Sequence, residues 1–130
     1  MSHYPNDRRY SEDHEWARLD GDVVVGVSAH AVEQLGDITL VTVDVSVGDV
    51  IEAGKAFGTI ESVKTLSDIL APIAGKVTAI NNELENAPEL LNEDCYDKGW
   101  LIKLAPANPG DLDNLMDAAA YEGFVKRAAH

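Results

Sequence analysis

The sequence predicts a mostly β fold, a sandwich of two small sheets with short helices and a helical tail at the C-terminus. Strand-like apolar runs are frequent, and glycines separate them at turns. Aromatic residues make up only 6% of the chain, so aliphatic and β-branched side chains must fill most of the core. Two strand-rich halves flank Lys64, which suggests a weak internal duplication and a quasi-symmetric pair of sheets. We expect residues 1–130 to form one domain.

In the first half, residues 1–10 are polar and are expected to be loosely ordered. Ser28 as an N-cap and Gly36 as the residue after the last turn predict a helix of about two turns between them. The other elements follow from alternation and turn residues: strands at 23–27 and 38–45, and turns at 20–21, 47–50 and 53–55.

In the second half, the apolar runs 56–63 and 65–71 predict a β-hairpin with Lys64 at its tip. Asn108 and Pro109 have the pattern of an N-cap and a first helical residue, which predicts the helical tail 109–130. Between hairpin and tail we expect a turn at 72–75, a strand at 76–80, one helical turn at 81–86 that Pro88 ends, and a last strand at 100–104.

Composition excludes several classes of function. With 23 acidic and 10 basic residues the net charge is −13, so the chain should repel nucleic acid, and any charge-steered partner should be basic. Apolar runs are too short for a membrane span, and the single cysteine, Cys95, excludes an intramolecular disulfide. The N-terminus has no secretory or targeting pattern. We expect a cytoplasmic protein, or a mitochondrial-matrix one if the chain is a processed eukaryotic form.

The motifs of enzyme catalysis are missing from the sequence. The four histidines show no metal-ligand spacing with Cys95, and there is no phosphate-binding loop or nucleophile elbow. His14 is expected to be structural, beside Trp16, and His30 to be a surface or capping residue. Lys64 is different, because an ammonium group at a hairpin tip is exposed and accessible to a modifying enzyme.

Ordered blocks at characteristic spacing run along the chain: His14-Glu15-Trp16, the segment 26–37, Glu61-Ser62-Val63-Lys64 with Ser67-Asp68, and the runs 88–94 and 99–103. Together, over about residues 9–125, they resemble the H-protein family of the glycine cleavage system. The resemblance implies a flattened barrel-sandwich hybrid of the lipoyl/biotinyl kind. It also implies a non-catalytic carrier with lipoate bound covalently to Lys64.

The resemblance further implies roles for the residues around that lysine. A lipoate ligase, or a lipoyl or octanoyl transferase, would recognise the residues that flank it: Glu61, Ser62, Val63, Ser67 and Asp68. Glu15 and Asp68 would line the cleft that receives the loaded arm. The chain departs from the family pattern at Ala29, His30, Gln34 and Thr65, and it has Cys95 where proline is frequent.

The implied cycle has three partner enzymes. A pyridoxal-phosphate glycine decarboxylase loads an aminomethyl group onto the arm, and a tetrahydrofolate-dependent aminomethyltransferase removes it. A flavin enzyme, dihydrolipoyl dehydrogenase, then reoxidises the dithiol. We expect the carrier to be a monomer with no nucleic-acid or membrane partner.

Other functions remain open at this point. A biotinyl carrier would have methionine on both sides of the lysine, where Val63 and Thr65 stand, and a lipoyl domain of a 2-oxo acid dehydrogenase would have Asp-Lys-Ala. A lipoate-relay protein that resembles the H-protein, and a lipoate-binding carrier of sulfur oxidation, are closer alternatives. A purely structural acidic β domain would carry no modification at all.

Overall fold

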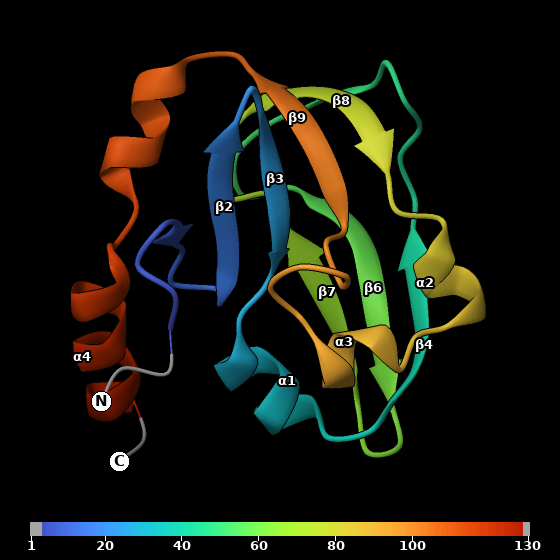
Figure 1. Ribbon diagram of the computed structural model, residues 1–130. Helices are drawn as coiled ribbons and strands as arrows, with labels where there is room; N and C mark the ends of the chain where they lie inside the picture. Colours follow the sequence, from blue (N-terminus) through green and yellow to red (C-terminus); the bar gives the residue numbers. More distant parts are fainter. Residues whose placement is uncertain (1–3, 129–130) are drawn as a thin grey trace.

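Two antiparallel sheets face each other in the computed structural model, which describes residues 4–128 (Figure 1). The larger sheet has the strand order β1-β2-β3-β9-β8-β5, and the smaller has the order β4-β6-β7. The strands are β1 Arg9–Tyr10, β2 Glu15–Asp20, β3 Asp22–Val27, β4 Ile38–Val43, β5 Val50–Ile51, β6 Ala56–Ser62, β7 Leu66–Leu70, β8 Gly75–Ile80 and β9 Ile102–Pro106. The helices are α1 Ala29–Leu35, α2 Glu83–Asn86, α3 Leu90–Glu93, the 3-10 helix η1 Pro109–Asn114 and α4 Ala118–Ala128.

The predicted fold class is confirmed: the chain is mostly β, in two sheets, with short helices and a C-terminal helix. The helix α1 begins and ends where the sequence predicts. The Ser28 hydroxyl accepts a hydrogen bond from Ala31 N at 3.3 Å, and Gly36 N donates to Val32 O. The hairpin of β6 and β7 is present, with Lys64 in its connecting turn.

Five details of the sequence prediction are wrong. Strand β2 was missed because its first three residues are buried on both faces of the sheet, which removes the alternating pattern. Strand β5 was also missed: it is only two residues long and overlaps the expected turn 47–50 at Val50. Pro88 ends α2 but also precedes a new helical turn, α3. The last strand begins at Ile102, and the two sheets are unequal in size rather than quasi-symmetric.

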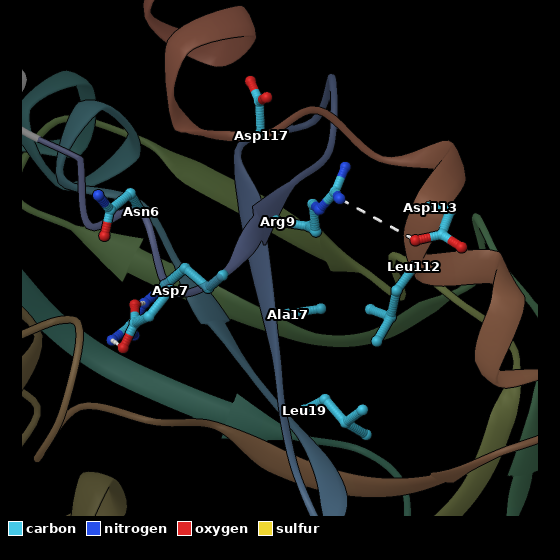
Figure 2. Close-up of a pocket in the computed structure, with 9 residues that line it drawn as sticks. Asn6, Asp7, Arg9, Ala17, Leu19, Leu112, Asp113 and Asp117 are labelled. Atoms are coloured by element: carbon cyan, nitrogen blue, oxygen red, sulfur yellow. Dashed lines mark hydrogen bonds and ion pairs between the residues drawn. The ribbon is translucent and has the colours of Figure 1, made fainter.

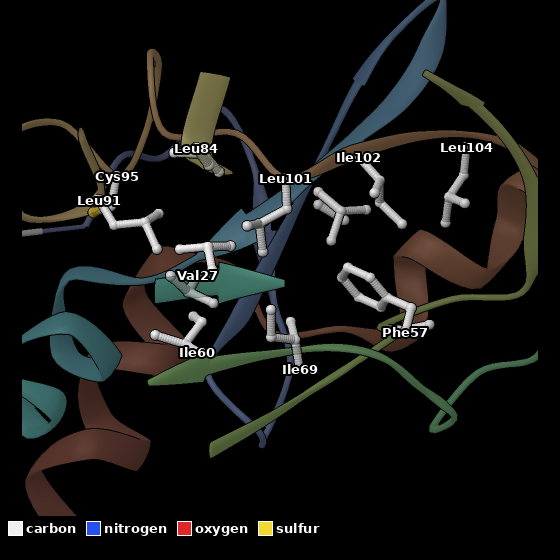
Figure 3. Packing of buried hydrophobic residues seen from close by; sticks show 14 of the residues in the cluster. Val27, Phe57, Ile60, Ile69, Leu84, Leu91, Cys95, Leu101, Ile102 and Leu104 are labelled. Carbon is white, nitrogen blue, oxygen red and sulfur yellow. The ribbon is translucent and has the colours of Figure 1, made fainter. Parts of the chain in front are cut away.

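The main core lies between the two sheets and is almost entirely aliphatic (Figure 3). Phe57 is the aromatic member of its buried set, as the low aromatic content predicts. Ile60 and Ile69 of the hairpin strands, each 1% exposed, point into this core towards Leu101 and Val27. The hairpin that carries Lys64 is therefore anchored at its base, so that its tip is held on a rigid support.

A second, aromatic cluster joins the N-terminus to the C-terminal helix α4. Tyr10 and Tyr121 stack with ring centroids 4.6 Å apart, and both are fully buried. Tyr4 packs edge-on against each of them, and Tyr10 Oη donates to Pro5 O. The expectation of a loosely ordered segment 1–10 therefore fails for Tyr10, which is a buried strand residue; residues 1–3 lie outside the described part of the chain.

The tail 109–130 also differs in detail from the expectation. Asn108 caps the segment as predicted, since its Oδ1 accepts from Gly110 N at 3.1 Å. The helix that follows is the 3-10 helix η1, and α4 begins only at Ala118. Residues 129–130 lie outside the described range. Between residues 4 and 128, no helix has the length and apolar character needed to cross a bilayer.

Candidate functional site

The turn at the tip of the β6–β7 hairpin is closed by a single serine. Ser62 is the last residue of β6, and its hydroxyl accepts from Lys64 N at 3.4 Å and from Thr65 N at 3.2 Å. Its backbone N also donates to Thr65 O at 2.8 Å. These bonds hold the turn in one conformation and leave the Lys64 side chain exposed, as the sequence predicts.

Around the tip, the outer face of the smaller sheet carries an apolar and acidic surface. Leu40, Glu61 and Leu66 lie directly opposite one another on β4, β6 and β7, and Val63 is in the turn beside them. Leu66 is 63% and Val63 69% exposed, which is unusual for side chains of this size. We call the four residues the tip surface. Glu61 and Val63 were predicted from the sequence, but the two leucines were not: Leu66 is two residues after Lys64, and Leu40 reaches this place only through the register of β4 on β6.

The predicted residues Ser67 and Asp68 lie on β7 but differ in environment. Asp68 is exposed on the outer face, opposite Thr59. Ser67 points the other way and is partly covered, and its hydroxyl donates to Asp68 O at 3.4 Å. Asp68 is therefore free to meet a charged group, whereas Ser67 is part of the strand's inner face.

Glu15 is buried, only 3% exposed, at the start of β2. Its Oε1 accepts from the Ser11 hydroxyl at 2.8 Å, and its Oε2 accepts from Leu70 N on β7 at 3.3 Å. Burial raises the pKa of this carboxyl to about 8, because the charged form loses its hydration. The fold thus brings Glu15 to Leu70 on β7, two residues beyond Asp68 on the same strand. Glu15 is buried there, whereas Asp68 is exposed.

His14, just before β2, and His30, on α1, belong to a polar contact between α1 and α4. The Tyr121 hydroxyl lies 2.6 Å from Ser28 Oγ and 2.7 Å from His14 Nδ1. Burial, and then the neighbouring His30, lower the pKa of His14. His14 also has a left-handed backbone, with φ of 71°. These contacts and this backbone conformation give His14, the residue before Glu15, a structural role, as the sequence predicts.

Besides a groove of about 440 Å³ between residues 4–6 and α4, two surface grooves lie apart from the predicted site residues. One, of about 350 Å³, lies between β1–β2 and η1, where Arg9 approaches Asp113 at 4.0 Å (Figure 2). The other, of about 320 Å³, runs between α1 and α3. Neither contains Lys64, Glu15 or Asp68. Among residues 4–128, no three histidine, cysteine or acidic side chains gather in a metal-binding arrangement.

The chain is similar in sequence to known proteins along almost its whole length. The sequence model of the family described as glycine cleavage H-protein matches residues 8–128. The chain belongs to this family. It is 52% identical over 123 residues to the glycine cleavage system H protein of Bacteroides fragilis, covering 94% of this chain and 97% of that protein. It is also 52% identical over 127 residues to glycine cleavage system H protein 2 of Pseudomonas putida, covering 96% and 98%.

A solved structure supports the same family assignment. The crystal structure of a glycine cleavage system H protein from Mycobacterium marinum superposes with a TM-score of 0.86 at 36% sequence identity. The superposition covers 94% of this chain and 98% of that one. The H-protein fold therefore extends over both sheets and the helices that follow them.

Cys95 is expected to be dispensable for function. It is 7% exposed, and burial raises the pKa of its thiol to about 11, so that the reactive thiolate is scarce at neutral pH. Its carbonyl, which accepts from Trp16 Nε1 at 3.1 Å, does not depend on the side chain. Cys95→Ser should leave glycine-dependent carbon dioxide exchange within twofold, roughly, and reduce the unfolding free energy by about 1–2 kcal/mol. A tenfold loss of exchange with an intact circular dichroism spectrum would contradict this.

Proposed function

We propose that this protein is a lipoyl carrier of glycine cleavage, with lipoate attached as an amide to Lys64. The observation that carries the proposal is the exposed Lys64, held at the tip of a closed hairpin in a chain of the H-protein family. The chain would carry an aminomethyl group from glycine decarboxylase to the tetrahydrofolate-dependent aminomethyltransferase, and electrons to dihydrolipoyl dehydrogenase. It would be a substrate of these enzymes rather than a catalyst.

The residues around Lys64 fit a covalently held group. The Lys64 side chain is exposed, and Ser62 fixes the turn without using the lysine, so the amine is available to an acylating enzyme. The lipoyl group, when attached, supplies a strained disulfide that accepts a carbon fragment together with electrons. Amide formation removes the ammonium charge, and the long arm that results raises the local concentration of substrate at each partner.

The tip surface suggests how the modifying enzyme and the partners would recognise this end of the molecule. Leu40, Val63 and Leu66 offer an apolar contact, and Glu61 lies among them. With a net charge of −13, the chain would be steered towards a partner whose lysine-binding channel has a basic rim. Glu61, Ser62, Val63, Ser67 and Asp68 are proposed as the recognition residues, with Ser62 acting through the shape of the turn. The relatives named above are bacterial proteins, and we propose that this chain works in the cytoplasm.

The proposal is tested by reconstitution. The chain is incubated with a lipoate ligase, ATP and lipoate, and the product is followed by intact mass and peptide mapping. The lipoylated form should support glycine-dependent exchange of carbon dioxide with a glycine decarboxylase, and the unmodified form should not. Equal exchange by both forms would refute a carrier role for lipoate. Transfer of the lipoyl group to another lipoyl domain, without exchange, would instead favour the lipoate-relay function.

Asp68 and Glu15 are proposed to shield the loaded arm, whose terminal amine is protonated at neutral pH. A carboxylate that binds such an amine in a partly dry site contributes about 1.5–3 kcal/mol, which is roughly a ten- to hundredfold change in the docked population. Asp68 is the exposed partner. Glu15 is the buried one, and it must lose the proton that its raised pKa retains at neutral pH, and release an existing hydrogen bond, before it can bind the amine.

We therefore expect Asp68→Asn and Glu15→Gln, each lipoylated and loaded, to lose the fragment faster. Loading by the decarboxylase should persist, because the free arm performs that step. The measurement is the non-enzymatic release of ammonia and formaldehyde over time. Asp44→Asn is the control, because it removes an exposed carboxylate that directly follows β4 and is not on either strand of the hairpin. If both variants retain the fragment as long as the parent protein, the two acids do not form the cleft.

A further inference from the structure

The side chain of Lys64 lies along the backbone of Gly36, just after α1. A Cβ atom placed on Gly36 would lie 3.3 Å from Lys64 Cε and 3.8 Å from Nζ. Gly36 has φ of 81° and ψ of −143°, a conformation that residues with a Cβ avoid. The glycine thus provides both the turn out of α1 and the open backbone on which the lysine methylenes rest.

Asn92 of α3 holds this same piece of backbone from another side. Its Nδ2 donates to Gly36 O at 2.9 Å, and its Oδ1 accepts from Ile38 N at 3.0 Å. One amide therefore binds a carbonyl at the end of α1 and an N–H at the start of β4. Asn92 is itself exposed, but Leu91 beside it is fully buried and fixes α3 on the core.

The segment between these two bonds also contacts the hairpin turn. Asp37 O accepts from Val63 N at 3.0 Å, one residue before the lysine. In Figure 1 the connection from α1 to β4 passes beside the tip of the β6–β7 hairpin, at the lower end of the molecule. Asn92, the segment 36–38 and the turn with Lys64 form one continuous chain of contacts.

We propose that Asn92 is a positioning residue for Lys64. By binding the backbone of segment 36–38, Asn92 fixes the surface on which the lysine side chain rests, which we call the seat. The inference rests on the proposed modification of Lys64 and adds a residue whose side-chain amide binds the backbone at Gly36 and Ile38. With the seat fixed, the amine is presented in one direction, which favours attack on the activated acyl carbon. With the seat loose, the tip surface still binds the enzyme, but the amine samples unproductive positions.

The test compares Asn92→Ala with Asn82→Ala, each as the full unmodified chain. Asn82 is a matched control, because it is exposed at the start of α2 and makes no side-chain capping bond. Hydrogen exchange measured by NMR reports the seat directly, without any modifying enzyme. In Asn92→Ala the Val63 amide should exchange about tenfold faster, since the bond to Asp37 O opens more often, whereas the Val41 amide in the middle of β4 should be unchanged.

The second readout is the rate of lipoylation by a lipoate ligase, with the chain as the varied substrate. For Asn92→Ala we expect kcat to fall about fivefold with KM nearly unchanged. Gly36→Ala, which places a methyl group on the seat, should change kcat in the same direction. Parent-like Val63 exchange and parent-like kcat in Asn92→Ala would overturn the proposal. A parent chain that accepts no lipoate would refute the proposed function alone, because the exchange measurement still decides the role of Asn92.

Discussion

Replacing Lys64 with arginine should abolish lipoylation and all carrier activity while leaving the fold intact. Arginine keeps the positive charge, but its guanidinium group stays protonated and is not a nucleophile for amide formation. Because Lys64 is exposed and the turn is closed by Ser62, the substitution should change the unfolding free energy by less than about 0.5 kcal/mol. Intact mass after incubation with a lipoate ligase should show no added lipoyl group, and glycine-dependent exchange should fall to background.

Two other lysines provide the controls for this experiment. Lys55 lies in the turn before β6, and Lys76 is exposed on β8. Lys55→Arg and Lys76→Arg should be lipoylated like the parent chain, because neither lysine is at a hairpin tip between an apolar surface and a fixed turn. Lipoate found on either residue, or on Lys64→Arg, would show that the assigned attachment site is wrong.

The second large effect concerns the pH dependence of stability, which Glu15 should dominate. Its pKa is raised from 4.5 to about 8 in the folded protein, so the folded state holds a proton that the unfolded state releases within that range. Its stabilising contribution is therefore complete below pH 4.5 and is lost as the pH rises towards 8. Each pKa unit corresponds to about 1.4 kcal/mol, so the full loss is about 5 kcal/mol, a large share of a typical domain's stability.

Glu15→Gln should remove this loss, because an uncharged amide in the same place has no proton to release. Urea unfolding of the unmodified chain at pH 5, 6.5 and 8 gives the unfolding free energy of the parent and of the variant. The effect is the difference between their two curves of unfolding free energy against pH. Glu85→Gln, at an exposed position on α2, is the matched control and should follow the parent. His14 acts in the opposite direction: its lowered pKa removes stability as the pH falls below 6.5. Parallel curves for parent and Glu15→Gln would show that the Glu15 carboxyl ionises normally.

Much of the fold follows from signals that are local in the sequence. The caps of α1, Ser28 and Gly36, act within one turn of the helix, and the hairpin forms between strands that adjoin in the chain. The exposure of Lys64 follows from its place in that hairpin. Local signals failed where burial on both faces hides the strand pattern, as in β2, and where an element is very short, as in β5.

The candidate site was only partly predictable for a related reason. Glu61 and Val63 lie within three residues of the lysine in sequence, but Leu40 reaches the tip surface through the register of β4 on β6. Asn92 stood within a recognised sequence block, yet nothing in that block indicates which backbone it binds. The register of the sheets and the packing of α3 had to be known before either residue could be given a role.

The sequence by itself determined the two-sheet class, the lysine-bearing hairpin and the aliphatic core, because propensities, turns and burial patterns act between near neighbours. Only the tertiary structure decided that Glu15 is buried and that Asn92 supports the lysine. Glu15 binds a backbone N–H 55 residues away, and Asn92 binds a carbonyl 56 residues away. The protonation of a carboxyl group and the partners of an amide depend on what surrounds them in space, and chain folding alone brings such distant groups together.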